Sequence, residues 1–364
     1  MESMPFHTWA QSQSLPPAHL PLTTAIIPAL LTSISRIGSA LRHRHHISAA
    51  DGNPLNPFGD TQLNVDVLAE QLLRETIASC PAISTASSEE DPVERRVIHP
   101  RRSSDTDTET DTEASSPRYT VAFDPLDGSS IIGPNWTVGT IIGIWLGESA
   151  LHSQPSTHQV AAILGVYGPR TTAVVAIRIP GHEPLCVEVG LGLSPSPTPS
   201  PSPFDEHPQN AIIREKVRFH AAPTPTGRET RYFAPANLRA AAQDPRYWHL
   251  VGRYIREGYT LRYSGGLVPD VVHALSKGRG VYLSPVTGRS GAKLRRLYEL
   301  MPVALVVECA GGRAVDPADG GDVLARAAEG CDERAGLVCG DGYEVGFAMK
   351  ELGGSAMEDL GQEV

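Results

Sequence analysis

The chain has 364 residues, of which 40% are hydrophobic, so it is long enough for two ordinary domains or one large domain with a sizeable core. Its 31 basic and 41 acidic residues give a formal net charge of −10, which provides no electrostatic reason to expect nucleic acid or an anionic membrane as a partner. The five cysteines show neither a C-x-x-C pair nor the spacing of a zinc site, and we expect mostly buried thiols in a reducing compartment.

The N-terminal region is polar and contains several prolines, so residues 1–21 are predicted to form a flexible arm. Its first residues, MESMPFHTWAQSQS, lack the charged start and the apolar stretch of a secretory signal. No window of the chain reaches the ~18 consecutive apolar residues of a membrane helix. We therefore expect a cytoplasmic location.

Two amphipathic helices are predicted after this arm. The first begins near Thr23 or Thr24 and places its apolar residues near a 3.6-residue period, at Ile27, Leu30, Leu31, Ile34, Ile37 and Leu41. The second covers residues 64–79, NVDVLAEQLLRETIAS, and repeats the same period.

Two low-complexity segments interrupt the chain. RRSSDTDTETDTEASS (101–116) is predicted to be a solvated loop, because it lacks the glycine and the final glutamate of a calcium-binding EF-hand loop. LSPSPTPSPSP (193–203) has a proline at every second position, which is typical of an extended linker. The predicted organisation is an N-terminal half (22–192, with the insertion 101–117), a linker (193–208), a C-terminal half (209–352) and a tail (353–364).

Both halves contain strand-like and helix-like sequence. Before the linker, strands are predicted at YTVAF (119–123), TVGTIIGIW (137–145), VAAILGVY (160–167) and TTAVVAIRI (171–179). After the linker come a helical stretch and the apolar runs GVYL (280–283) and VALVVECAGG (303–312). This mixture favours a layered α/β or α+β protein.

The stretch VAFDPLDGSS (121–130) holds the most informative motif. The predicted strand 119–123 delivers Asp124 at its end, and Asp127 returns to the same side of a tight turn. Two close carboxylates repel each other unless a cation neutralises them, and oxygen ligands suit magnesium. Three consecutive N–H groups and two hydroxyls that can bind a phosphate follow at Gly128, Ser129 and Ser130. A metal beside a phosphate indicates phosphoryl transfer; the alternative is an Asx-type turn whose acids only bond to the backbone.

Three glutamates elsewhere in the chain support the first of these interpretations. Glu89 and Glu90 are adjacent in ASSEEDP (86–92), after a short predicted strand, where they would make sense as one metal ligand and one base. Glu299 is the single acid in the basic and apolar stretch KLRRLYELMP (293–302). Each could be an ordinary exposed glutamate if considered alone, but together with the aspartate turn they favour a common site.

Three motifs occur in a fixed order along the chain: S-E-E, F-D-P-L-D-G-S-S and K-L-R-R-L-Y-E. In this order they resemble the fructose-1,6-bisphosphatase and sedoheptulose-1,7-bisphosphatase family, within the wider lithium-sensitive, magnesium-dependent phosphatases. The similarity covers roughly residues 22–350 and extends to GDTQLNVDVLAE, APANLR, LRYSGGLVPDV and ELMPVALVVECAGG. The resemblance implies a layered α-β-α-β-α sandwich with two sheet-containing halves. It also implies a hydrolase of phosphoric monoesters that acts on sugar bisphosphates.

The resemblance further implies roles for individual residues. Two or three Mg²⁺ ions, with Mn²⁺ as an alternative, would be held by Glu89, Asp124, Asp127, Glu299 and the backbone carbonyl of Leu126. The attacking water would be oriented and deprotonated by Asp66 and Glu90. The phosphate that leaves would lie against Gly128, Ser129 and Ser130. The sugar and its distal phosphate would contact Asn237, Arg262, Tyr263, Lys293 and Arg295. Because the family's equivalent of Arg262 reaches across a subunit interface, a homo-oligomer (dimer or tetramer) is implied.

Departures from the fructose-bisphosphatase pattern bear on the substrate. Ile131 stands where those enzymes usually have asparagine, and Ala240 and Ser284 stand at two positions that usually carry tyrosine. The loss of two rings would widen the pocket for a seven-carbon sugar, which favours hydrolysis of the C1 phosphate of sedoheptulose 1,7-bisphosphate to sedoheptulose 7-phosphate. The AMP-binding pattern and the spaced regulatory cysteine pair found in parts of the family are not evident.

Three alternatives stay open. A fructose-1,6-bisphosphatase shares the same chemistry, whereas an inositol-type monophosphatase is disfavoured because Arg262 and Lys293 suit a second phosphate. A regulatory binding protein with this fold but without catalysis would predict a missing metal ligand, yet each expected carboxylate is present.

Overall fold

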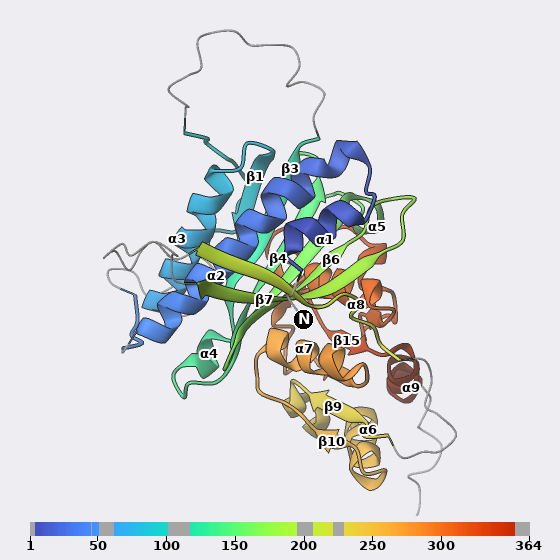
Figure 1. Ribbon diagram of the computed structural model, residues 1–364. Helices are drawn as coiled ribbons and strands as arrows, with labels where there is room; N and C mark the ends of the chain where they lie inside the picture. The colour runs from blue at the N-terminus through green and yellow to red at the C-terminus, as the bar shows by residue number, and fades with distance from the viewer. Residues whose placement is uncertain are drawn as a thin grey trace, which may run out of the picture.

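Helices and sheets alternate in five layers, in the order α-β-α-β-α (Figure 1). This arrangement confirms the predicted fold class. The computed structural model describes residues 4–44, 46–50, 62–100, 117–194, 207–220 and 229–353. The predicted acidic loop 101–116 and most of the proline-rich linker and of the tail lie outside the described residues.

The larger sheet has eight strands in the order β2-β1-β3-β4-β5-β6-β7-β8. β1 and β3 run parallel, whereas the other neighbouring pairs are antiparallel. Helices cover both faces of this sheet, so its central strands are apolar on both sides and all of β3 is buried. The strands are β1 (Ile83–Ser88), β2 (Arg95–Arg96), β3 (Tyr119–Asp127), β4 (Val138–Leu146), β5 (Gln159–Tyr167), β6 (Thr171–Ile177), β7 (Leu185–Ser194) and β8 (His207–Arg214).

The first outer layer is helical and includes the segment predicted to be a flexible arm. Residues Phe6–Ser12 form a helix that buries Phe6 and Trp9, and the N–H of Ile212 in β8 donates to the carbonyl of Met4 (2.9 Å). A flexible arm was predicted here because the segment is mostly polar. Its few apolar side chains are spaced by one helical turn, so a helix can bury them together. The layer contains α1 (Phe6–Ser12), η1 (Pro17–His19), η2 (Leu22–Ile26), α2 (Ile27–His43) and α3 (Asn64–Ala78).

The predicted apolar face of α2 is buried against α3 and β5–β8. The helical run Pro17–His43 is long and apolar enough, by length and composition, to cross a membrane, although polar residues interrupt its apolar sequence. However, 56% of its apolar window is buried inside the protein. Core helices of soluble proteins pass the same test, so the run is weak evidence for a membrane span.

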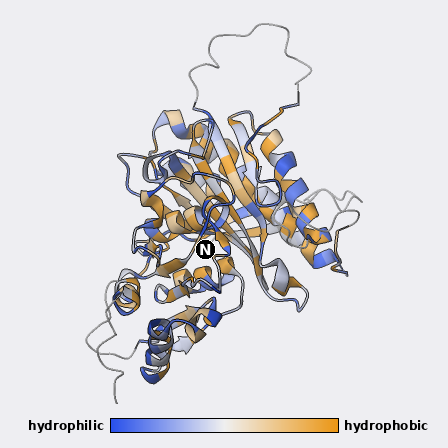
Figure 2. Cartoon of the chain, turned by 180° about the vertical axis from the view of Figure 1, so that it is seen from behind, coloured by the Kyte–Doolittle hydropathy of each residue, from blue (hydrophilic) through white to orange (hydrophobic). Residues whose placement is uncertain are grey.

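The middle layer lies between the two sheets and explains the apolar run VALVVEC. This run forms a helix instead of a strand. The helix contacts β4, β5 and β6 on one side and β13 (Arg313–Val315) and β15 (Leu337–Gly340) on the other, so it is apolar on all sides except at Glu308, which pairs with Arg178. Figure 2 shows the same distribution, with apolar residues in the interior strands and helices and polar residues on the outer helices. The layer contains α7 (Leu267–Lys277), η5 (Arg296–Leu300) and α8 (Met301–Cys309).

The smaller sheet has five strands in the order β10-β9-β11-β15-β13. β10, β9 and β11 are mutually parallel, so their carboxyl ends lie at one edge. The strands are β9 (Tyr232–Pro235), β10 (Thr260–Leu261), β11 (Val281–Ser284), β13 (Arg313–Val315) and β15 (Leu337–Gly340). The second outer layer contains η4 (Leu238–Ala242), α6 (Pro245–Arg256) and α9 (Gly342–Gly353). The remaining elements are α4 (Ser129–Ile132), α5 (Pro155–His158), η6 (Val323–Ala325), and the paired strands β12 (Leu294–Arg295) and β14 (Arg334–Ala335).

The proline-rich linker does not separate the two halves at the predicted place. β7 and β8 form an antiparallel pair on either side of it, with Ser194 opposite His207, so β8 belongs to the larger sheet. The chain enters the smaller sheet only at β9. The prediction relied on composition, which shows where a chain is extended but not which strands pair across the gap.

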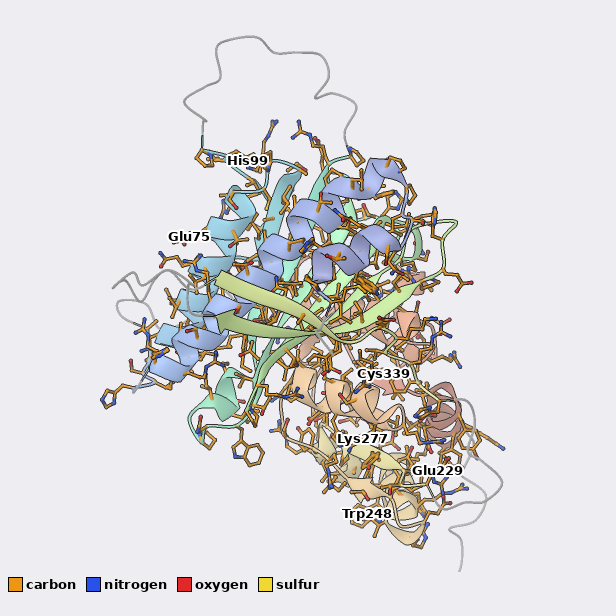
Figure 3. The ribbon with its side chains drawn as sticks, viewed as in Figure 1. Glu75, His99, Glu229, Trp248, Lys277 and Cys339 are labelled. Carbon is orange, nitrogen blue, oxygen red and sulfur yellow. The ribbon has the colours of Figure 1, made fainter. Side chains whose placement is uncertain are left out.

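The cysteines are free thiols, and four of them are buried, at Cys80, Cys186, Cys309 and Cys339. Cys339 lies in the interior of the C-terminal half, whereas Trp248 projects from its outer edge (Figure 3). The predicted burial of the thiols is thus observed.

Candidate active site

A bulge at the end of β3 brings the two aspartates of the DPLD motif together. The strand does not stop at Phe123 as predicted but continues to Asp127. Asp124 pairs with Ile141 and Asp127 with Gly139, so a step of three residues on β3 faces a step of two on β4. Residues three apart on a regular strand point to opposite faces, and the extra residue of the bulge returns Asp127 to the side of Asp124.

The carboxylates of Asp124, Asp127 and Glu299 form a buried cluster in which one oxygen from each lies within 4.8 Å of the others. Glu299 belongs to η5, a π-helical turn that leads into α8. Its Oε2 accepts a hydrogen bond from the backbone N–H of Arg295 (2.5 Å). Single π-helical turns inside helices occur frequently at functional sites, since they redirect one side chain.

Glu89 lies at the same edge of the sheet as Asp124. β1 and β3 are parallel and end side by side, and the N–H of Glu89 donates to the carbonyl of Phe123 (3.0 Å). The carboxylate of Glu89 forms an ion pair with the guanidinium of Arg295, whose side chain is only 4% exposed. Arg295 therefore contacts the acidic cluster, where its charge neutralises part of a group of close carboxylates. Its contact with the sugar phosphate stays a prediction.

The electrostatics of this cluster favour a bound cation. Burial raises the pKa of Asp124 well above its usual range, and repulsion from Glu89, Asp127 and Glu299 raises it further. Burial also raises the pKa of Asp127 to about 7, although N–H groups of Val268 and Leu267 oppose this rise. Hard oxygen donors that repel one another in a buried site fit Mg²⁺ or a similar divalent ion.

Asp127 connects the two halves of the protein. Its Oδ1 accepts a hydrogen bond from the N–H of Leu267 (3.2 Å), and its Oδ2 accepts one from the N–H of Val268 (2.6 Å). Both donors belong to the first turn of α7, where N–H groups have no partner within the helix. The carboxylate is thus held in place by the N-terminus of a helix, whose dipole also stabilises its charge.

Asp66 and Glu90, the two expected water-activating residues, lie near Glu89. Asp66 is in the first turn of α3 and its Oδ2 accepts a hydrogen bond from the N–H of Leu63 (2.7 Å), while its buried Oδ1 has no hydrogen-bond partner among the described residues. Burial, together with the charge of Glu89, raises the pKa of Asp66 to about 7. Oε2 of Glu90 accepts a hydrogen bond from Gln62 (2.9 Å).

The expected phosphate cradle follows directly on Asp127. Gly128 has a φ of 87°, which favours glycine, and Ser129 and Ser130 begin the short helix α4. The side chain of Ile131 packs against three glycines, Gly128, Gly265 and Gly266. A Cβ atom added to any of them would lie 3.4 Å from the isoleucine side chain. The isoleucine thus joins the cradle to the turn that precedes α7.

Two profiles of one family match the chain: the fructose-1-6-bisphosphatase N-terminal domain over residues 22–192 and the C-terminal domain over residues 226–352. The chain belongs to the fructose-1,6-bisphosphatase family. Members of this family are phosphatases that hydrolyse sugar bisphosphates.

Relatives within the family include both branches that the sequence resembles. The chain is 36% identical over 304 residues to the chloroplastic sedoheptulose-1,7-bisphosphatase of Triticum aestivum, covering 83% of this chain and 66% of the wheat protein. It is 31% identical over 300 residues to the class 1 fructose-1,6-bisphosphatase of Syntrophotalea carbinolica, covering 80% and 78% of the two chains. The expected likeness to the sedoheptulose branch is thereby confirmed.

Solved structures show the same fold. A Toxoplasma gondii protein assigned as a sedoheptulose-1,7 bisphosphatase superposes with a TM-score of 0.76 at 30% identity, covering 96% of this chain and 98% of that one. The fructose-1,6-bisphosphatase of Leishmania major in its holo form superposes with a TM-score of 0.74 at 22% identity, covering 96% and 99%. The second likeness concerns the fold alone.

In this member of the fructose-1,6-bisphosphatase family, the expected sugar-binding residues lie at the carboxyl edge of the smaller sheet or near it. Asn237 follows β9 in the left-handed conformation (φ 48°), and its Nδ2 donates to the carbonyl of Pro285 (2.7 Å) and to Oγ of Ser290 (3.1 Å). Lys293 is exposed and has no ion pair among the described residues. Arg262 and Tyr263 follow β10 and line a groove of about 1160 Å³ together with the C-terminal end of α2.

Ala240 and Ser284 do not line a widened pocket in the way the sequence suggested. Both side chains are buried, with 0% and 8% of their surface exposed. Tyr247 belongs to the same core cluster as Ala240, and its hydroxyl donates to the carbonyls of Ala236 (2.9 Å) and Leu283 (3.3 Å). The ring of Tyr247 from α6 thus lies in the same cluster as Ala240, and its hydroxyl reaches the residue before Ser284. The small size of the two residues does not by itself create space for a longer sugar.

Two groups of hydrogen bonds that were not predicted from the sequence hold the backbone around the candidate site. Thr140 of β4 donates to the carbonyl of Pro125 (2.8 Å) and shares a hydrogen bond with the hydroxyl of Tyr167 (2.6 Å), which fixes the backbone between the two aspartates. Asp270 accepts hydrogen bonds from the N–H groups of Ser264 (2.7 Å) and Gly265 (3.3 Å), which fixes the turn before α7. Asp270 is the aspartate of LRYSGGLVPDV, one of the segments that resemble the family, so the sequence contained a signal for it. No sequence pattern indicated the contact made by Thr140.

Proposed function

We propose that the protein is a Mg²⁺-dependent phosphatase that hydrolyses the C1 phosphate of sedoheptulose 1,7-bisphosphate. The observation that carries this proposal is the buried cluster of Asp124, Asp127 and Glu299 next to the turn Gly128–Ser130, since such a cluster suits a divalent cation and the turn suits a phosphate. The choice of sugar rests on the sedoheptulose-1,7-bisphosphatases among the relatives, at 33–36% identity.

Each group of residues has a part in the proposed reaction. When bound, the metal supplies Lewis-acid chemistry that polarises the phosphate and makes water more acidic. Asp66 and Glu90 hold the attacking water, and the unpartnered Oδ1 of Asp66, on a carboxylate with a pKa of about 7, can accept its proton. The N–H groups and hydroxyls of the Gly128–Ser130 turn bind the phosphate oxygens during in-line attack.

The far end of the substrate is assigned to Asn237, Tyr263 and Lys293, which hold the sugar and its distal phosphate. Arg262 is exposed and lines the groove next to α2, so its side chain is accessible to a second subunit. We therefore include a homo-oligomer in the proposal. Size-exclusion chromatography with light scattering of the wild type and of Arg262→Ala measures whether this arginine supports the oligomer.

The decisive assay is phosphate release with Mg²⁺, comparing sedoheptulose 1,7-bisphosphate and fructose 1,6-bisphosphate in parallel. We expect a higher kcat/KM for the seven-carbon ester. Preference for the fructose ester would keep the chemistry and make the protein a fructose-1,6-bisphosphatase, which the class 1 relatives at 31–32% identity support as the second candidate. No release from either ester would contradict the enzymatic proposal and favour a binding protein of the same fold.

Lys293→Ala should raise KM for the bisphosphate by about 10- to 100-fold and change kcat by less than about threefold. A charge-assisted hydrogen bond to a phosphate far from the breaking bond contributes to binding in the ground state and the transition state alike. Steady-state kinetics measure both constants, and Lys216→Ala, at an exposed lysine after β8, provides the control. An unchanged KM would show that Lys293 is only a solvated surface residue.

A further inference from the structure

The carboxyl edge of the smaller sheet gathers residues from three loops. β9, β10 and β11 are parallel and in register, with Phe233 opposite both Leu261 and Val281. The chain that follows each strand therefore emerges at one edge, which is where open sheets with parallel strands bind ligands. Asn237 follows β9, Tyr263 follows β10, and the segment 285–293 follows β11.

Asn237 fixes the first of these loops to the third. Its Nδ2 donates to Pro285 and Ser290, while its Oδ1 is buried and has no hydrogen-bond partner among the described residues. A buried amide oxygen without a partner is costly, and a hydroxyl of a bound ligand would satisfy it. This asparagine is also the N-cap of η4, so it sets the direction in which the next residues point.

Arg239 is the second residue of η4. It is exposed and forms no ion pair with any of the described residues, and the next residue, Ala240, turns into the core. The charge of Arg239 acts on the phenol of Tyr263, where it opposes the rise in pKa that burial and Asp270 cause. η4 follows β9 and Tyr263 follows the neighbouring parallel strand β10, so both residues belong to loops at the carboxyl edge of the smaller sheet.

Three cations from two of these loops have no acidic partner in the described part of the chain: Arg239, Arg289 and Lys293. Arg262, from the remaining loop, donates to the carbonyl of Leu261 (2.8 Å) and lies 6.0 Å from the ring centroid of Tyr232, and it has no ion pair within the described ranges. The acid nearest to them, Asp270, accepts hydrogen bonds from the N–H groups of Ser264 (2.7 Å) and Gly265 (3.3 Å). Four cations on these loops against this acid create a local potential that attracts an anion, although the whole chain has a charge of −10. A phosphate dianion, which accepts several charge-assisted hydrogen bonds, matches this arrangement.

We propose that Arg239 is a specificity-determining residue that binds the distal phosphate of the sugar bisphosphate, together with Lys293. This inference rests on the proposed function and adds a residue to it. The planar guanidinium supplies two parallel donors to the phosphate, and it does so from an element whose position Asn237 fixes. Arg239 thus selects esters with a second phosphate over monophosphates, while the carboxylate cluster performs the hydrolysis.

The test compares two esters that differ only in the distal phosphate, sedoheptulose 1,7-bisphosphate and sedoheptulose 1-phosphate, with Mg²⁺. For Arg239→Ala we expect KM for the bisphosphate to rise about 10- to 100-fold with kcat within about threefold, because one or two charge-assisted hydrogen bonds are lost. The kcat/KM for the monophosphate should change by less than about twofold. Arg239→Lys should recover part of the loss, since it restores the charge without the planar pair of donors.

Arg256→Ala is the matched control, because Arg256 is an exposed arginine away from the sheet edge. α6 begins shortly after η4, and Arg256 is its last residue, about 16 Å along the helix axis from its first. It should leave both esters unaffected. An unchanged KM of Arg239→Ala, or equal losses on both esters, would overturn the assignment of Arg239 while leaving the proposed function intact. A wild type that hydrolyses neither the two sedoheptulose esters nor fructose 1,6-bisphosphate and fructose 1-phosphate would overturn both the proposed function and the assignment of Arg239. If only the fructose esters react, the comparison of bisphosphate and monophosphate is made with them.

Discussion

Asp127→Asn should reduce kcat by at least about 10³-fold while the protein still folds. The substitution removes one negative charge from a cluster whose oxygens lie within 4.8 Å of one another, and so removes a ligand for the cation. Loss of several kcal/mol of transition-state stabilisation corresponds to a decrease of this size. The fold should persist because the asparagine oxygen can still accept one of the two hydrogen bonds from α7, and because repulsion among buried carboxylates decreases.

Three measurements check this prediction. Phosphate release gives kcat, near-ultraviolet circular dichroism reports the packing of the core, and a thermal melt with and without Mg²⁺ reports metal binding. The wild type should gain stability on addition of Mg²⁺ and the variant should gain little. Asp322→Asn, at an exposed aspartate paired with Arg313, serves as the control and should behave like the wild type. Full activity of Asp127→Asn would refute the metal site.

The metal-free protein should lose several kcal/mol of unfolding free energy between pH 5 and pH 8. Asp66 and Asp127 have pKa values of about 7 in the folded protein against an ordinary value of 3.8. A carboxyl whose pKa is raised on folding contributes its full stability below pH ~4, where both states are protonated, and loses it as the pH rises towards 7. A shift of this size corresponds to about 4 kcal/mol for one group.

Urea unfolding at pH 5, 6, 7 and 8, with a chelator and with Mg²⁺, measures this dependence. The stabilisation by Mg²⁺ should increase with pH, since the cation and the protons compete for the same carboxylates. Asp66→Asn should flatten the curve of the metal-free protein, because one of the titrating groups is absent. A metal-free stability that stays constant or rises from pH 5 to pH 8 would contradict the prediction.

The sequence by itself determined the family, the layered fold and the residue types of the site. Two motifs with high local information, FDPLDGSS and SEE, lie at the ends of neighbouring parallel strands, and an apolar run with a single acid supplied Glu299. Periodicity also predicted α2 and α3, because one face of each helix is buried against the sheet. These features depend on short stretches of chain, in which the order of residues largely decides the local structure.

Only the tertiary structure decided which groups meet. The bulge in β3, the pairing of β7 with β8 across the proline-rich linker, and the helix formed by VALVVEC each depend on neighbours distant in sequence. The same holds for Arg295, which lies against Glu89, and for the position of Arg239 at the carboxyl edge of the smaller sheet. The physical reason is that burial and charge compensation are set by contacts between remote segments, whereas sequence patterns report only the preferences of each segment.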